Sequence, residues 1–264
     1  MKCLLRIYIF AGVPGSGKTS VIKHCIKYLE GQKAYVKVDV FFSEDDAKIE
    51  ANFKRKEFSR DVCPDHYTAH KLEEYKIWAE LHGAEHLFLE TAGLCFRCSP
   101  YTRNAAAVAV VDAVGTDVRK LGPLIQHADI IAVTKYDLIS QAERDIIKYR
   151  IRKMNAEAQL FEVNGISGEG CYELVKTAKE IAEQRAEEPM ELRFDPPACI
   201  CEFCYGSKSL LKSKNMAFMK QALELAKKIP KLNCGACGYE LCNLFIRQVL
   251  RGKEDPKKCV FYKE

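Results

Sequence analysis

Residues 6–19 read Arg-Ile-Tyr-Ile-Phe-Ala-Gly-Val-Pro-Gly-Ser-Gly-Lys-Thr. An apolar, β-rich run at 7–11 leads into a loop at 12–19 that fits the phosphate-binding pattern G-x4-G-K-[ST] without a gap. Glycines allow such a loop to wrap a phosphate and turn its N–H groups inward. Lys18 is expected to reach the phosphates and the Thr19 hydroxyl to hold Mg2+. The expected nucleotide-binding residues of this loop are Gly12, Gly15, Ser16, Gly17, Lys18, Thr19 and Ser20.

The composition indicates a chain with a sizeable core. The 264 residues are 48% hydrophobic and 29% charged, with a net charge of +5, which allows one large domain and a small one. No dense basic run favours nucleic acid, and no apolar stretch approaches the roughly 18 residues of a membrane span. The first residues lead directly into the predicted strand and do not form a cleavable signal peptide. We therefore expect a cytoplasmic protein that binds neither nucleic acid nor membrane.

Strand and helix patterns alternate through the first two thirds of the chain. Such alternation predicts an α/β fold, a doubly wound, mostly parallel sheet of the P-loop NTPase type. The strands are predicted at 7–11, 34–42, 86–93, 105–113, 129–133 and 160–163. The helices are predicted at 19–30, 43–58, 71–83, 121–128, 140–158 and 171–187.

Two acidic residues stand near the ends of predicted strands, where ligands bind in such sheets. Asp39 is expected to hold Mg2+ through water or to orient the attacking water; the alternative is an ordinary acid at a strand end. Glu90 is expected to act through Mg2+-bound water, and the N–H group of Gly93 to contact the γ-phosphate and release it on hydrolysis. The expected catalytic residues are thus Lys18, Asp39 and Glu90.

The segment 134–137, Thr-Lys-Tyr-Asp, resembles the guanine-binding motif N-K-x-D of GTPases. An Asp at the position of Asp137 accepts both the ring N–H and the exocyclic amine of guanine, which adenine cannot offer in that arrangement. The stem of Lys135 would cover the base, while Thr134 replaces the usual Asn. Residues 164–170, with Ser167, resemble the Ser-Ala-x loop that follows the sixth strand. These residues favour GTP over ATP.

Most of the thirteen cysteines fall into groups. Disulfides are rare in the cytosol, so grouped thiols there suggest metal ligands. Cys95 and Cys98 supply half of a tetrahedral site, and a symmetric dimer would complete it for zinc, nickel or an iron–sulfur cluster. The alternative is a pair of packed or redox-inert thiols. Cys63, His66 and His70 form a weaker candidate metal site, for which a loop cysteine and two exposed histidines is the favoured interpretation.

The C-terminal part carries two more cysteine groups. Three of the nine prolines lie in 187–198, which is expected to be a linker. A helix with an apolar packing stripe is predicted at about 209–229. A group of four cysteines could hold a 4Fe-4S cluster, which needs four thiolate ligands. The rival interpretation is a zinc ribbon, but zinc ribbons usually have two C-x2-C knuckles and this chain has one. The first group is Cys199, Cys201 and Cys204, and the second is Cys234, Cys237, Cys242 and Cys259. The first group is expected either to bind a second metal or to pack beside the cluster held by the second group.

Together, the motifs in 6–170 resemble the SIMIBI class of P-loop GTPases. Within it they are most similar to the metallochaperone GTPases that insert nickel into hydrogenase and urease, and to the CobW-like proteins. Residues 90–93, Glu-Thr-Ala-Gly, match the E-[ST]-x-G switch of that group. Cys95 and Cys98 lie near the positions where the hydrogenase-type members carry metal ligands in their switch regions. The histidine-rich segment of some relatives is absent. The spacing C-x2-C-G-x3-C-x16-C resembles the iron–sulfur domain of corrinoid iron–sulfur proteins, their activators and an Rnf-complex subunit.

The resemblance implies a GTP-hydrolysing metallochaperone, or maturation factor, for a metal- or iron–sulfur-dependent enzyme. It would comprise a GTPase domain at 1–186, a linker at 187–198 and a small Cys-rich iron–sulfur domain at 199–264. GTP would close a homodimer around Cys95 and Cys98, which would carry a transferable Ni2+ or Zn2+, or a second cluster. The partner would be a client metalloenzyme or redox protein. The alternatives are a nucleotide-driven, low-potential electron donor and a regulatory GTPase with a structural zinc domain.

Overall fold

The computed structural model describes residues 4–40, 45–59, 63–93 and 99–194 of the first part of the chain. In the last part it describes 221, 224–225, 227–230, 232, 234–239 and 241–263. The chain divides into two compact units, Met1–Phe194 and Asp195–Glu264. Most of the helix predicted at 209–229 lies outside the described residues. No helix in the described ranges is long and apolar enough to cross a membrane.

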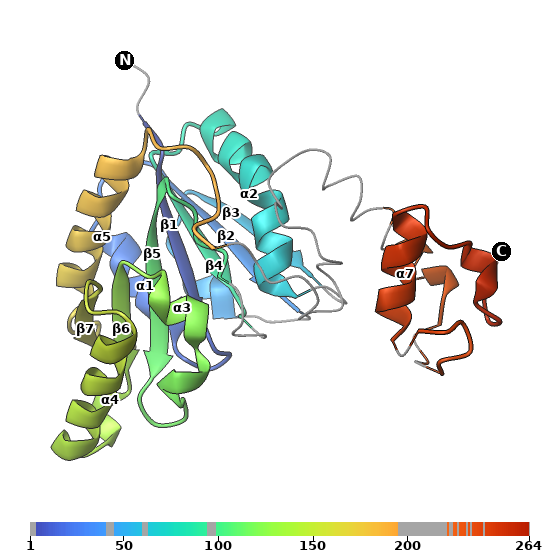
Figure 1. Ribbon diagram of the computed structural model, residues 1–264. Coiled ribbons are helices and arrows are strands. Elements are labelled where there is room, and N and C mark those ends of the chain that lie inside the picture. The colour runs from blue at the N-terminus through green and yellow to red at the C-terminus, as the bar shows by residue number, and fades with distance from the viewer. Residues whose placement is uncertain are drawn as a thin grey trace. The chain divides into compact units, whose positions relative to one another are not determined.

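The first unit is built on a seven-stranded sheet of order β3-β2-β4-β1-β5-β6-β7 (Figure 1). Every neighbouring pair is parallel, so the doubly wound prediction is confirmed. Apolar residues fill the central strands because both faces of a parallel sheet are covered by helices. The strands are β1 (Arg6–Gly12), β2 (Lys33–Asp39), β3 (Phe53–Phe58), β4 (His86–Thr91), β5 (Ala105–Asp112), β6 (Ile130–Thr134) and β7 (Gln159–Val163).

Helices cover both faces of the sheet. The α-helices are α1 (Lys18–Lys27), α2 (Pro64–Leu81), α3 (Gly122–Gln126), α4 (Gln141–Met154) and α5 (Cys171–Arg185). Short 3-10 turns are η1 (Asp45–Lys48), η2 (Val118–Lys120) and η3 (Tyr136–Leu138). The Ser140 hydroxyl caps α4 by accepting from the N–H of Glu143, as the sequence predicted.

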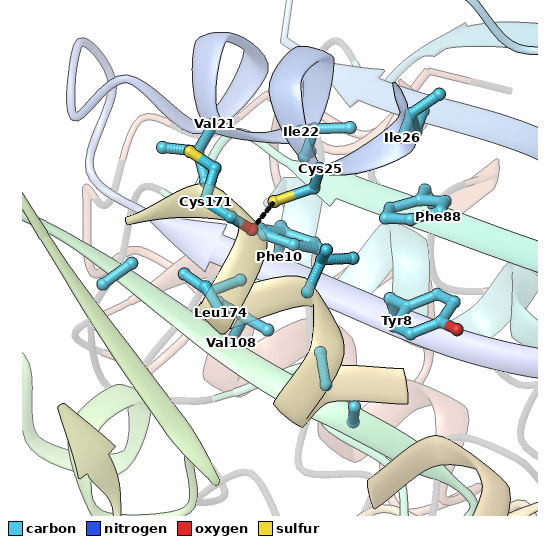
Figure 2. Close-up of a cluster of buried hydrophobic side chains, with 14 of the residues drawn as sticks. Tyr8, Phe10, Val21, Ile22, Cys25, Ile26, Phe88, Val108, Cys171 and Leu174 are labelled. Atoms are coloured by element: carbon cyan, nitrogen blue, oxygen red, sulfur yellow. Dashed lines mark hydrogen bonds between the residues drawn. The ribbon is translucent and has the colours of Figure 1, made fainter. Parts of the chain in front are cut away.

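Alternation along the strands assigns each helix to a face. Tyr8, Phe10 and Phe88 share one buried cluster with α1 and α5 (Figure 2). The Cys25 thiol of α1 donates to the carbonyl oxygen of Cys171 at the start of α5, 3.7 Å away, and burial raises the pKa of that thiol. Thr91, which points to the opposite face, donates to Asp65 of α2 at 2.9 Å. The core therefore lies on both sides of the sheet.

The helix predicted at 43–58 is wrong. Residues 53–58, Phe-Lys-Arg-Lys-Glu-Phe, form the edge strand β3, which pairs with β2. Its charged side chains suit an edge, where unpaired backbone must be kept from other chains. The inward Arg55 lies over the rings of Tyr75 and Trp78 of α2, so that its stem serves as apolar surface. The prediction failed because a run of charged residues is typical of a solvent-exposed helix as well as of an edge strand.

The described part of the expected linker is fixed to the first unit. Arg193 forms a two-pronged ion pair with Asp129, with both N–O distances 2.8 Å, and donates to the Thr102 carbonyl oxygen at 2.8 Å. Arg185 binds the same carboxylate from α5. A bridge between Thr102 and Leu192 adds a backbone tie. The boundary between the two units therefore falls after Phe194.

The described part of the second unit holds helix α7 (Cys242–Leu250) and the turn η4 (Pro256–Lys258). Its small core consists of apolar side chains and thiols together: Ile229, Cys237, Cys242, Phe245, Ile246 and Cys259. A unit of this size buries little apolar area, and such units commonly need a metal or disulfides for stability.

Replacing Arg193 by Met should lower the free energy of unfolding of the first unit by about 3 kcal/mol, because it leaves the largely buried Asp129 carboxylate short of one partner. Urea unfolding can be followed by fluorescence of Trp78, the only tryptophan of the chain. Arg119→Met is the matched control, since its ion pair with Asp117 is exposed. Equal effects from both variants would contradict the assigned role of Arg193.

Candidate functional site

The phosphate-binding loop lies between β1 and α1. A side chain at Gly12 would bring its Cβ within 2.3 Å of the Val110 carbonyl oxygen, so only glycine fits beside β5. Gly17, at φ 87°, ends the loop and precedes the first turn of α1. Lys18 folds back over the loop, and its ammonium donates to the carbonyl oxygens of Gly12 (3.0 Å) and Val13 (2.9 Å). Burial lowers the pKa of Lys18, an effect that Glu90 opposes.

The carboxylate of Glu90 lies at the centre of the site. The Thr19 hydroxyl donates to one of its oxygens at 2.7 Å, and the Tyr35 hydroxyl donates to the other at 2.6 Å. The ammonium of Lys37 is 3.9 Å from Glu90, 3.4 Å from the Thr19 hydroxyl and 3.3 Å from a carboxylate oxygen of Asp39. Thus α1, β2 and β4 each contribute to one cluster. Sequence analysis missed Tyr35 and Lys37, although both share a strand face with Asp39.

A pocket of about 480 Å³ opens over this cluster. The pocket joins most of the residues that the sequence predicted for phosphate and Mg2+. It is lined by Pro14, Gly15, Gly17, Lys18, Thr19, Ser20, Lys23, Lys37, Asp39, Lys48, Glu90, Ala92 and Gly165. Two further predicted residues lie close by: Ser16 is buried in the loop, and Gly93, at φ 48°, would place a Cβ 2.6 Å from the Gly12 carbonyl oxygen. The predicted switch glycine therefore touches the phosphate loop.

The predicted base-binding segments follow β6 and β7. Thr134 donates through its hydroxyl to the Ser16 carbonyl oxygen at 2.7 Å, so it braces the phosphate loop. Lys135, at φ 55°, donates to Asp112 at 2.6 Å and to the Gly15 carbonyl oxygen at 3.0 Å. Asp137 is exposed on η3. The structure thus joins this segment to the phosphate loop.

The loop after β7 is ordered by one side chain. Asn164 accepts from the N–H groups of Ile166 (2.9 Å) and Ser167 (3.1 Å), and Ser167 is exposed. Gly165 of the same loop lines the pocket. The loop therefore reaches the pocket beside Ser20 of α1 through Gly165, while Ser167 is not among the residues that line it.

The candidate at Cys63, His66 and His70 lies at the start of α2, which begins at Pro64 instead of Lys71 as predicted. The two histidines share a helix face, as their spacing of four requires. The expectation that they are exposed is wrong, because His66 is 3% exposed, and burial together with His66 lowers the pKa of His70 to about 4. In the part of the chain that the structure describes, no three His, Cys, Asp or Glu side chains form a group that could hold a metal ion.

Four cysteines of the second unit line one small pocket: Cys234, Cys237, Cys242 and Cys259. All four are free thiols; three are buried and Cys234 is exposed. Positive φ angles at Gly235 and Gly238 let the chain turn tightly around the first pair. Thiolates are soft ligands of the kind that bind an iron–sulfur cluster or zinc. The four cysteines share this pocket, but no three of their side chains in the described structure stand close enough together to form a metal-binding group. Five other predicted ligands, Cys95, Cys98, Cys199, Cys201 and Cys204, lie outside the described residues.

The parallel sheet, the phosphate loop and the pocket define a P-loop nucleotide-binding protein. The family model described as "CobW/HypB/UreG, nucleotide-binding domain" matches residues 6–162, more than half of the chain. The chain therefore belongs to the CobW/HypB/UreG family. A second family, described as "Putative Fe-S cluster", matches residues 229–261, the segment that contains the four-cysteine pocket.

One sequence relative and two solved structures are similar to this chain. The uncharacterized protein MJ0120 of Methanocaldococcus jannaschii is 39% identical over 228 residues, 82% of this chain and 96% of the relative. HypB from Helicobacter pylori, in complex with nickel, matches at 17% identity and a TM-score of 0.57, over 71% of this chain and 92% of that one. HypB from Archaeoglobus fulgidus matches at 21% identity and a TM-score of 0.53, over 67% and 90%. The two structural likenesses concern the fold alone.

Replacing Thr134 by Val should weaken nucleotide binding about tenfold, because the isosteric side chain cannot donate to the Ser16 carbonyl oxygen that braces the phosphate loop. Titration of a fluorescent GDP analogue measures the affinity. Thr134→Ser keeps the hydroxyl and should bind within about threefold of the wild type. Wild-type affinity in the Val variant would show that the brace does not matter.

Proposed function

We propose that the protein is a GTP-hydrolysing metallochaperone or maturation factor that carries its own 4Fe-4S cluster. Family membership and the pocket around Thr19 and Glu90 support the nucleotide part. The four-cysteine pocket, which coincides with the iron–sulfur family match, supports the cluster part. The observation that carries the proposal is the joining of Lys18, Thr19, Asp39 and Glu90 in one pocket at the end of the sheet.

Each residue has a defined chemical task in hydrolysis. Lys18 would exchange the Gly12 and Val13 carbonyl oxygens for phosphate oxygens, which are stronger acceptors for an ammonium group. Thr19, Asp39 and Glu90 offer the hard oxygen donors that suit Mg2+, directly or through water, and the metal would neutralise charge on the phosphates. Asp39 or Glu90 would orient the attacking water. Gly93, packed against Gly12, would respond to the presence of the γ-phosphate.

Asp137 is the residue for which we propose guanine instead of adenine as the bound base. Its carboxylate offers two acceptors to the two donors on the guanine edge. Asp137 is exposed on η3, which follows β6, the strand that braces the phosphate loop through Thr134. The Asn164-ordered loop with Ser167 would lie along the other side of the base.

Asp137→Asn should lower GTP affinity by at least tenfold and raise affinity for XTP, because the amide replaces one acceptor by a donor and xanthine presents an oxygen where guanine presents its amine. Competition against a fluorescent GDP analogue measures both affinities. Glu169→Gln, a charge change in the neighbouring loop, is the control. Unchanged GTP affinity in Asp137→Asn would remove the guanine assignment.

The metal-delivery part rests on the cysteines. Cys95 and Cys98 follow Gly93 closely in sequence, so we propose that they carry a transferable Ni2+ or Zn2+ within a homodimer that closes with GTP. Nickel is a candidate cargo because one structural relative, HypB from Helicobacter pylori, was solved with it. The client would be a metalloenzyme or redox protein. Cys199, Cys201 and Cys204 would hold a second metal or cluster.

The proposal is tested by anaerobic purification followed by iron, sulfide, nickel and zinc analysis, with and without GTP and Mg2+. About four irons per chain are expected, as one four-thiolate cluster requires, together with a nucleotide-sensitive nickel or zinc. Cys95→Ala/Cys98→Ala should lose only the transferable metal, while Cys237→Ala should lose iron and sulfide. Zinc without iron or sulfide would favour a regulatory GTPase with a structural zinc domain.

A second function, nucleotide-driven electron donation, is favoured by the exposure of Cys234, which would place the cluster near the surface. In that case the cluster is the active cofactor and its potential should shift when nucleotide binds. Metal delivery is replaced by this function if two results are found together. The metal analysis detects iron and sulfide but no nickel or zinc, and the Cys95 and Cys98 substitutions change cluster content or potential.

A further inference from the structure

Lys37 is a buried lysine with no role in the functions described so far. It lies on β2, an inner strand of the sheet, and its side chain is 4% exposed. Lysine is almost never buried this deeply unless it is paired, because removing an ammonium group from water is costly. Its side chain therefore needs a compensating partner in the site.

The partners of Lys37 are the residues assigned to Mg2+. Its ammonium lies 3.3 Å from Asp39, 3.4 Å from the Thr19 hydroxyl and 3.9 Å from Glu90. These are the hard oxygen donors that a magnesium site requires. A cationic group of the protein thus stands among the donors that would bind the metal, which shows that the donor set fits a cation.

Lys37 offsets part of the negative charge of this cluster, while Lys23 and Lys48 add positive charge to the wall of the same pocket. Lys18 and Lys37 supply two positive charges, and Asp39 and Glu90 supply two negative charges. A divalent ion that entered this cluster alone would meet an ammonium group within a few ångströms and would have to displace it. The tetra-anionic phosphates of GTP would change the balance, because they offer Lys37 new partners in the pocket that it lines.

We propose that Lys37 is an internal counter-ion that holds the Mg2+ site closed to divalent metals until nucleotide binds. The ammonium occupies the cation position in the nucleotide-free protein and gives it up when phosphates arrive. A protein that handles other divalent metals would thereby keep them out of its hydrolytic site. Lys37 is a positioning residue in this role, and the inference rests on the proposed nucleotide binding.

The test measures Mn2+ binding to the full-length, nucleotide-free protein by electron paramagnetic resonance of the free ion. Lys37→Met should bind Mn2+ about tenfold or more tightly than the wild type, because the repelling ammonium has gone. Lys37→Arg should behave like the wild type, since it keeps the charge. Lys48→Met removes a positive charge from the pocket wall without freeing the carboxylates, and should change the affinity less than threefold.

A second measurement adds a non-hydrolysable GTP analogue. The wild type and Lys37→Met should then bind Mn2+ within about threefold of each other, because the ammonium no longer occupies the site. Lys37→Gln replaces the Met variant if circular dichroism shows that the latter is unfolded. Equal Mn2+ affinity of the nucleotide-free wild type and the uncharged variant would overturn the proposal.

Failure of the counter-ion role is distinguishable from failure of the proposed function. If the wild type binds a fluorescent GDP analogue but excludes Mn2+ no better than Lys37→Met, only the role of Lys37 is lost. If the wild type binds no nucleotide, the proposed function is lost first.

Discussion

The carboxylate of Glu90 is the constraint on which the site depends. A buried carboxylate needs donors on both oxygens, since an unpaired one would cost several kcal/mol. Thr19 and Tyr35 meet that need from α1 and β2, while β4 carries the carboxylate itself. The three hydrogen-bonding elements are therefore fixed relative to one another, and with them the position of the phosphate loop.

Backbone contact supplies the second constraint. Gly12 lies against the Val110 carbonyl oxygen on one side and against Gly93 on the other. Since neither contact leaves room for a Cβ, a shift of the segment after β4 must press on the phosphate loop, and the reverse also holds. This close packing links the phosphate loop to Gly93 at the end of the described segment after β4.

Most strands of the sheet and most of the pocket could be predicted because each depends on a short, contiguous stretch of sequence. Phosphate loops, strand-end acids and helix caps depend on neighbours in sequence, so residues 12–19 and Ser140 could be assigned directly. β3 could not, because an edge strand is recognised by its place in the sheet, and its charged residues Lys54 and Lys56 match a solvated helix equally well.

Tyr35 and Lys37 were missed for a different reason. Alternation places them on the same face as Asp39, but only the strand order shows that this face meets Glu90 and Thr19. The early start of α2 was hidden because Cys63 is not a usual capping residue, even though Pro64 is well suited to a first turn. Contacts between distant segments therefore account for most of what the sequence left open.

Thr134 shows how the structure resolves a departure from a known motif. The usual Asn would brace the loop and contact the base, and Thr134 replaces it in this chain. The Thr134 hydroxyl retains the first task through the Ser16 carbonyl oxygen, while its methyl group packs beside Gly17. A single hydroxyl that is already committed to the loop has little left to offer a base. If the protein binds GTP as we propose, discrimination between bases would then rest on Asp137, and Lys135, which donates to Asp112, would cover the ring plane.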